Sequence, residues 1–177
     1  MATVPVPITW VAGVVVTAAN MNGLRDALNF LLNPPQAALR QGVAQSLTSG
    51  TQTAITMDLE DRDNDGGHST SSNTSRYTAQ TAGWFRVDGG VTYIANATGI
   101  RVQFWRINNV TQNVGGTASA SIGTGTSTRM AAASVFMFLN VADFVELFGD
   151  QTSGGALLTD VANGAQSYMT VDYRGTT

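Results

Sequence analysis

The chain has 177 residues, a formal net charge of −3 and no cysteine, and only 12% of its residues are charged. The length suffices for one domain with a sizeable core, and the charge fraction is about half that of an average soluble domain. An acidic balance argues against nucleic-acid binding, and a chain without cysteine has no disulfide or thiol chemistry.

Residues 1–42 are predicted to form an extended arm followed by one short helix. Pro5 and Pro7 fix φ and bias the residues before them away from helix. Thr17 is a typical N-cap, and good helix formers fill residues 18–32 before Asn33 and two prolines stop the helix. The apolar run before Thr17 is too short for a membrane span or a secretory signal, so no membrane insertion is expected.

Four long apolar side chains share one side of this helix at heptad spacing: Met21, Leu24, Leu28 and Leu31. A lone helix of about fifteen residues is marginal in water, and burying each of these side chains would contribute roughly 1.5–3 kcal/mol. The helix therefore needs a partner, and we predict that it anchors the chain. The partner is the chain's own β domain, two further copies around a symmetry axis, or a larger assembly.

From about residue 43 the apolar pattern changes to period two, which predicts strands. Ile55, Met57 and Leu59 alternate with polar residues, and residues 85–93 keep one phase. Short strands with frequent turns, and no helical pattern after residue 42, favour a sandwich.

The phase of the central strands separates buried from exposed aromatics. Tyr93 shares the phase of Phe85 and is expected to be buried, whereas Trp84 has the opposite phase and is the best candidate for an exposed ring. Residues 101–107 change phase midway, which predicts either a bulge or a strand that is apolar on both faces.

The second half of the chain predicts four further segments. Residues 115–128 have little apolar content and predict a long loop or a weak edge strand. Residues 133–139 and 144–148 form a hydrophobic pair joined by a short turn, and residues 168–173 predict a closing strand.

An acidic segment precedes the central strands. Asp61, Asp63, Asp65 and Gly66 have the opening spacing of a calcium-binding loop, but Ser72 stands where the loop's last ligand, a glutamate, is expected. The segment is therefore a candidate calcium site, and the alternative is a solvated acidic loop. No other cofactor is indicated.

The sequence shows no pair of side chains with the spacing of a catalytic site. His68 is the only histidine, so zinc would lack further soft ligands, and we expect it to make a loop hydrogen bond. Asp143 is expected in a turn, and Glu146 is expected to face away from its strand neighbours Val145 and Leu147. Because nothing sets two carboxylates across a cleft, as glycoside hydrolysis requires, we predict that the chain is not an enzyme.

Tyr77, Gly83 and Phe85 carry a family resemblance, and Val87 stands where the signature has its last aromatic residue. An aromatic residue, a gap of five residues, a glycine and alternating apolar residues resemble the signature of the C1q and tumour necrosis factor (C1q/TNF) superfamily. The resemblance implies an all-β, C1q/TNF-like jelly-roll sandwich, here preceded by the arm and the helix. We place this head domain at residues 43–177.

Two later segments extend the likeness. Residues 139–147 resemble the family's late hairpin, with Ala142 where the family usually has glycine. Residues 168–175 resemble its aromatic-rich closing strand.

The resemblance also implies a homotrimer with an aromatic and aliphatic seam around its axis. The candidates for that seam are Phe136, Phe138, Phe144 and Phe148. The alternative is that these rings form the core of a single copy.

The N-terminal run is similar to a leader found on virion proteins of bacteriophages that infect actinobacteria, where it precedes a C1q-like head. The residues that carry this similarity include Trp10, Gly13, Thr17, Asn20, Asn22, Arg25, Asp26, Pro34 and Pro35. All nine basic residues are arginine, which agrees with such a host.

Together these features predict a non-enzymatic bacteriophage structural protein located in the virion. Its partners would be further copies of itself, other virion proteins of the tail or capsid, and a host cell-surface glycan. A minor tail or fibre-like protein is the first interpretation, and a capsid decoration or head-fibre trimer is the second. A free carbohydrate-binding module is the third, and it would leave the helix without a role.

Overall fold

A computed structural model describes residues 4–6, 9–112, 116–120, 127–131, 134–162, 164 and 166–176. The elements in chain order are α1 Ala18–Leu32, β1 Gln36–Arg40, β2 Ser46–Leu47, β3 Thr53–Ala54, β4 Leu59–Asp63, β5 Arg76–Thr78, β6 Gly83–Tyr93, β7 Ile100–Ile107, β8 Val110–Thr111, β9 Thr117–Ala120, β10 Thr128–Ala131, β11 Val135–Leu139, β12 Phe144–Gln151, β13 Leu157–Leu158 and β14 Tyr168–Gly175.

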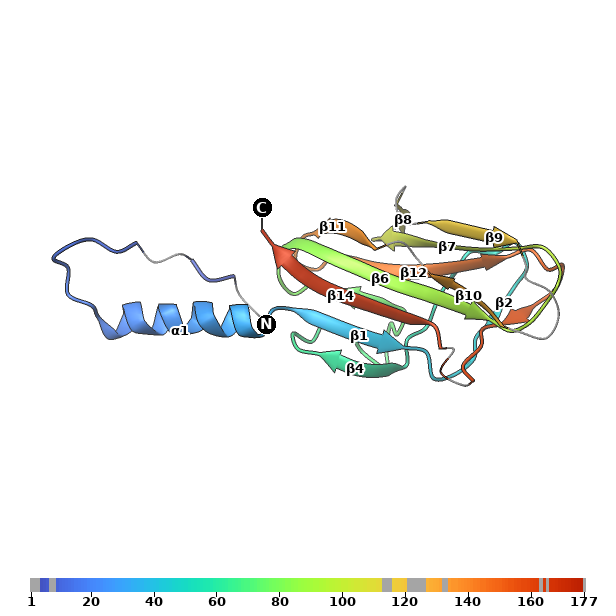
Figure 1. The fold of residues 1–177 in the computed structure, drawn as a ribbon, viewed down its shortest axis with the longest axis horizontal. Coiled ribbons are helices and arrows are strands. Elements are labelled where there is room, and N and C mark those ends of the chain that lie inside the picture. The colour runs from blue at the N-terminus through green and yellow to red at the C-terminus, as the bar shows by residue number, and fades with distance from the viewer. Residues whose placement is uncertain are drawn as a thin grey trace.

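The predicted helix is confirmed, and local signals explain both of its ends. Asn20 donates its backbone N–H to the Thr17 hydroxyl (3.3 Å) while its own side-chain oxygen accepts from the Thr17 N–H (2.9 Å), which closes a capping box. Asn33 caps the other end, and proline follows. The helix has no buried residue and projects from one end of the sandwich (Figure 1).

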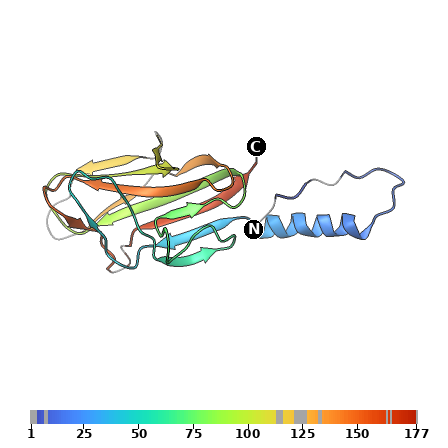
Figure 2. The same cartoon turned by 180° about the vertical axis from the view of Figure 1, so that it is seen from behind.

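Strands β10, β6, β14, β1 and β4 lie side by side in that order, and β11 also pairs with β6; we call this the β6 sheet (Figure 1). A second sheet orders β3, β12, β7 and β8, with β5 on β12 and β9 on β7; we call this the β12 sheet, and the reverse view shows it in front (Figure 2). Strands β2 and β13 form a small separate pair. The predicted sandwich is therefore confirmed.

The core fills the space between the two sheets. Phe85, Val87, Val91 and Tyr93 point inward from β6, as the predicted phase requires, and Trp105 faces them from β7. Alternate residues of a strand point to opposite faces, so one register buries the whole set.

Strand β7 matches neither predicted alternative in full, because it has no bulge against β12 and its two covered faces carry polar as well as apolar residues. It pairs with β12 without a register shift, so it carries no bulge against that strand. Arg101, Gln103 and Trp105 are buried on its inner side, while Phe104 is buried on its outer side.

The pairing expected for the hydrophobic segments around residues 140–143 is wrong. Strand β11 pairs with β6 and strand β12 pairs with β5, β7 and β3, so the two belong to opposite sheets. The turn between them carries the chain across the sandwich. Ala142 has φ +73°, a left-handed conformation that usually selects glycine.

The sandwich begins earlier than the predicted boundary between residues 42 and 43. Strand β1 lies between β14 and β4, directly after the prolines that end the helix segment. Ile55 and Met57 of the predicted alternation are buried but lie between strands, at residues 55–58. Leu59, the third residue of that alternation, begins β4 and is 37% exposed. Strand β9 pairs with β7, while the rest of the predicted loop at residues 115–128 lies largely outside the described residues. Among the helices described, none is long and apolar enough to cross a membrane.

Candidate functional site

An exposed cluster of rings lies on the outer face of the β6 sheet. We call Trp84, Phe136 and Phe138 the aromatic surface; their exposed fractions are 41%, 60% and 42%. Phe138 lies directly across from Trp84 in the β11–β6 register, and the two rings meet edge to face at 5.6 Å. The strand phase predicted the exposure of Trp84, but not that two phenylalanines of β11 would join it.

Charged side chains next to the aromatic surface cancel within one copy. Arg86 pairs with Asp88 (3.0 Å) on β6, and Arg174 pairs with Asp172 (3.6 Å) on β14. Arg86 also lies across from Asp172 in the β14–β6 register. This face therefore presents uncovered rings beside a neutral group of four charges.

The other two predicted seam residues lie on the opposite sheet. Phe144 and Phe148 belong to β12, so they share no surface with the rings of β11. Phe148 is only 6% exposed, because it stacks on Phe104 and the guanidinium of Arg106 lies over it at 4.1 Å. Arg76 lies over Phe144 at 4.0 Å. The prediction of one seam made of all four phenylalanines is therefore corrected, and Phe136 and Phe138 remain its candidates.

The apolar side of α1 is open. Its exposed apolar side chains include the four predicted ones, Met21, Leu24, Leu28 and Leu31, which we call the helix stripe. Leu32, at the end of the helix, is exposed as well. On a neighbouring side, Phe30 contacts Tyr173 of β14 edge to face at 5.3 Å, and this contact fixes the helix to the head.

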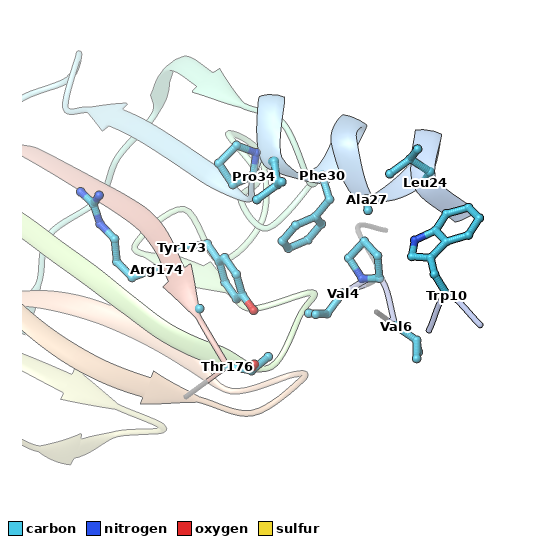
Figure 3. A pocket seen from close by; sticks show the side chains of 13 residues that line it. Val4, Val6, Trp10, Leu24, Ala27, Phe30, Pro34, Tyr173, Arg174 and Thr176 are labelled. Carbon is cyan, nitrogen blue, oxygen red and sulfur yellow. The ribbon is translucent and has the colours of Figure 1, made fainter. Parts of the chain in front are cut away.

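A hollow of about 600 Å³ lies between the helix, the arm and residues 173–176 (Figure 3). Val4 and Trp10 of the arm line it together with Leu24 and Leu31 of the stripe and the end of β14. Its lining is predominantly apolar, and several apolar side chains of the arm and helix around it are exposed.

The three carboxylates of the predicted calcium loop have separate partners. Asp61 forms two hydrogen bonds with Arg40 (2.5 and 2.6 Å), and hydrogen bonding to this guanidinium holds the pKa of its carboxyl below the usual range. Asp63 accepts from three backbone N–H groups of the loop that follows it. Asp65 is buried and accepts from the Tyr77 hydroxyl at 2.8 Å. No three acidic or histidine side chains gather as metal ligands within the described residues.

The carboxyl of Asp65 has an unusually high pKa, and burial is the main cause. Burial raises this pKa to about 6, against an ordinary value of 3.8, although the hydrogen bond from Tyr77 opposes the shift. The other carboxylate oxygen, Oδ1, is buried without a hydrogen-bond donor in the described structure. Burial likewise raises the pKa of Tyr77, with the charge of Asp65 as the next cause.

His68 fastens the same loop to the strands. Its Nδ1 lies 2.8 Å from the carbonyl oxygen of Arg76, and its Nε2 lies 2.8 Å from that of Met57. Both ring nitrogens are thus engaged with backbone, as expected for a structural loop residue.

The remaining acidic candidates also have local partners. Asp143 accepts from the Asn140 N–H and the Asn108 side chain (both 2.7 Å), and the bond from Asn108 is the main cause of its lowered pKa. Glu146 is buried on the outer side of β12 and accepts from the Ser75 hydroxyl at 2.6 Å. These contacts stabilise turns and strand edges.

Three solved structures share this fold. The globular domain of zebrafish complement 1qA protein aligns with a TM-score of 0.57 at 9% identity, over 81% of this chain and 98% of that one. Eiger TNF from S. frugiperda aligns with a TM-score of 0.54 at 12% identity, over 81% and 95%. Murine APRIL aligns with a TM-score of 0.58 at 9% identity, over 78% and 98%.

At these identities the likeness concerns the fold alone. The chain has a C1q/TNF-like jelly roll preceded by one short helix, as its signature residues predicted. No protein-family profile matches the chain, and no curated protein matches it.

Proposed function

We propose that this chain is a non-enzymatic structural protein of a bacteriophage particle. It associates as a homotrimer, its N-terminal region anchors it to other virion proteins, and its jelly-roll head projects from the particle.

The observation that carries the proposal is the aromatic surface. A single copy leaves three large rings uncovered on one sheet face, and each aromatic side chain buries about 150–250 Å² when covered. Exposed apolar clusters of this kind mark interaction sites. The neighbouring charges already cancel within one copy, so an identical surface can approach without leaving a buried unpaired charge.

The phage assignment is supported by the N-terminal run, which is similar to leaders of actinobacteriophage virion proteins. In the particle we favour a minor tail or fibre-like protein that contributes to attachment at the host surface, with a cell-surface glycan as ligand. A capsid decoration or head-fibre trimer is the second candidate, because it uses the same anchor and head.

A non-enzymatic role is supported by the hydrogen bonds that the acidic side chains make within the fold. Glu146 and Asp143, the two carboxylates weighed for hydrolysis, hold Ser75 and Asn108 in place. If the protein hydrolysed a glycan and substitution of both carboxylates abolished that activity, the enzyme interpretation would be restored.

The self-association is tested by sedimentation of the full chain. We expect a species of about 56 kDa, three times the 18.5 kDa of one chain. Phe138→Asp should shift it toward the monomer, because the trimer would bury an unpaired charge. Val110→Asp, at an exposed residue of β8 in the other sheet, is the matched control and should leave the mass unchanged. A wild-type mass of one chain at every concentration would refute the homotrimer.

The anchoring is tested in the particle. Deleting residues 1–35 removes the arm and helix but stops before β1, so the head should stay folded and be missing from purified virions. Retention of the shortened protein at normal copy number would refute the anchoring role. Imaging of labelled particles separates a tail location from a capsid location.

A further inference from the structure

The helix stripe stays exposed within the described part of a single copy, although Leu24 and Leu31 border the hollow that the helix shares with the arm. Phe30 and Ala27 are partly covered by the arm and Tyr173, whereas all four stripe residues are between 40% and 74% exposed. The helix is therefore already attached to its own head, and the stripe remains available for another chain.

The spacing and charge of the stripe fit a second copy of itself. Intervals of three, four and three residues keep one row of side chains facing a parallel helix of the same kind. The only charged residues of α1, Arg25 and Asp26, pair with each other at 2.9 Å. The helix thus has no net charge that would attract an acidic or basic partner. An identical helix can approach it without charge repulsion.

The stripe is continuous with the aromatic surface of the head. Leu24 and Leu31 line the same hollow as Gly175 at the end of β14. Gly175 in turn lies across from Trp84 in the β14–β6 register. Both apolar surfaces therefore meet at the junction of helix and head.

The exposed areas indicate that the two surfaces act together. At about 150–250 Å² per fully exposed ring, the aromatic surface exposes about 300 Å². At about 100 Å² of apolar area per fully exposed Leu or Met side chain, the stripe exposes about 200 Å². A standard contact buries about 800 Å² per partner, of which about 450–500 Å² is apolar. Neither surface reaches the apolar area of one such contact alone, and together they match one. A trimer, in which each copy contacts two others, therefore needs both surfaces.

We propose that the helix stripe packs against the same stripe of two other copies, so that three α1 helices form a parallel stalk beneath the trimeric head. The inference rests on the homotrimer proposed above and assigns the stripe to self-association. The apolar arm is then the part left to contact the rest of the particle.

The test uses the absence of cysteine from the chain. In a parallel stalk, the three copies of residue 28 face one another, so Leu28→Cys should form a disulfide-linked dimer under mild oxidation. Met21→Cys, at the other end of the stripe, is the second seam variant. Asn22→Cys is the matched control, because this exposed residue lies on the polar side of the same helix. The readouts are non-reducing electrophoresis and the mass of the reduced protein.

A trimeric mass with crosslinking at residue 28 or 21, and little at residue 22, supports the stalk. A trimeric mass with no crosslinking at the stripe, or with equal crosslinking at all three positions, overturns the stalk and leaves the homotrimer standing. A monomeric mass for the reduced variants and the wild type overturns both.

Discussion

Replacing Asp65 by asparagine should stabilise the fold near neutral pH and not at acid pH. The carboxyl is buried, one of its oxygens has no donor, and burial raises its pKa to about 6. Because this folded-state pKa lies above the ordinary 3.8, the folded chain binds the proton more tightly than the unfolded chain. The contribution of this group to stability is complete below pH 3.8 and is lost as the pH rises through 6.

The magnitude follows from the two pKa values. Their difference corresponds to about 3 kcal/mol, which we reduce to about 1–2 kcal/mol because the loop lies near the surface, where water screens the charge. Asparagine keeps an oxygen for the Tyr77 hydroxyl and carries no charge. At pH 7.5 we therefore expect Asp65→Asn to be more stable than the wild type by about 1–2 kcal/mol, or roughly 3–6 °C in Tm. At pH 4.5 the difference should be small.

The assay is thermal and urea unfolding at both pH values, at one protein concentration because self-association contributes to stability. Asp63→Asn is the matched control in the same loop. It should be less stable than the wild type at pH 7.5, since its carboxylate accepts three backbone N–H bonds. The reasoning fails if Asp65→Asn is less stable at pH 7.5, or if its difference from the wild type is equal at both pH values.

Three further changes test other features of the fold. Ala142→Gly should raise the free energy of unfolding by about 0.5–1 kcal/mol, because it relieves a left-handed alanine; an unchanged urea midpoint would contradict this. Gly99→Ala should cost more than Gly154→Ala, since both have positive φ but only the Cβ at Gly99 meets a backbone oxygen, that of Thr152, at 2.0 Å; equal losses in urea unfolding would show that the loop moves aside. Calcium should leave Tm unchanged because the three loop carboxylates have separate protein partners; a calcium-dependent rise that Asp63→Asn abolishes would restore the predicted site.

Features with local causes could be predicted from the sequence. Thr17 and the prolines after Asn33 set the ends of the helix, because caps and stops act within a few residues. The alternation along β6 placed Tyr93 inside and Trp84 outside, because period two fixes the face of each side chain.

Features that depend on pairing could not be predicted in this way. Alternation says which face a side chain occupies but not which sheet its strand joins, so β11 and β12 looked like one hairpin. Phe148 is covered by Arg106 of another strand, and no local sequence pattern predicts such a contact. The Asp65–Tyr77 bond is of the same kind, since it links two segments that only the folded loop brings together.

Arginines cover the phenylalanines of β12 but leave the aromatic surface of the β6 sheet uncovered. On the β12 sheet, Arg76 and Arg106 lie over the phenylalanines of β12 and close that face within a single copy. On the β6 sheet, Arg86 and Arg174 pair with aspartates instead, and no arginine lies over the aromatic surface within the described residues. A guanidinium over a ring contributes about 0.5–1 kcal/mol at an exposed site. Elsewhere on the β6 sheet Arg129 lies over Tyr168 at 5.5 Å, so arginines cover rings on both sheets but leave Trp84, Phe136 and Phe138 open. The aromatic surface is therefore the part of this face suited to a second copy.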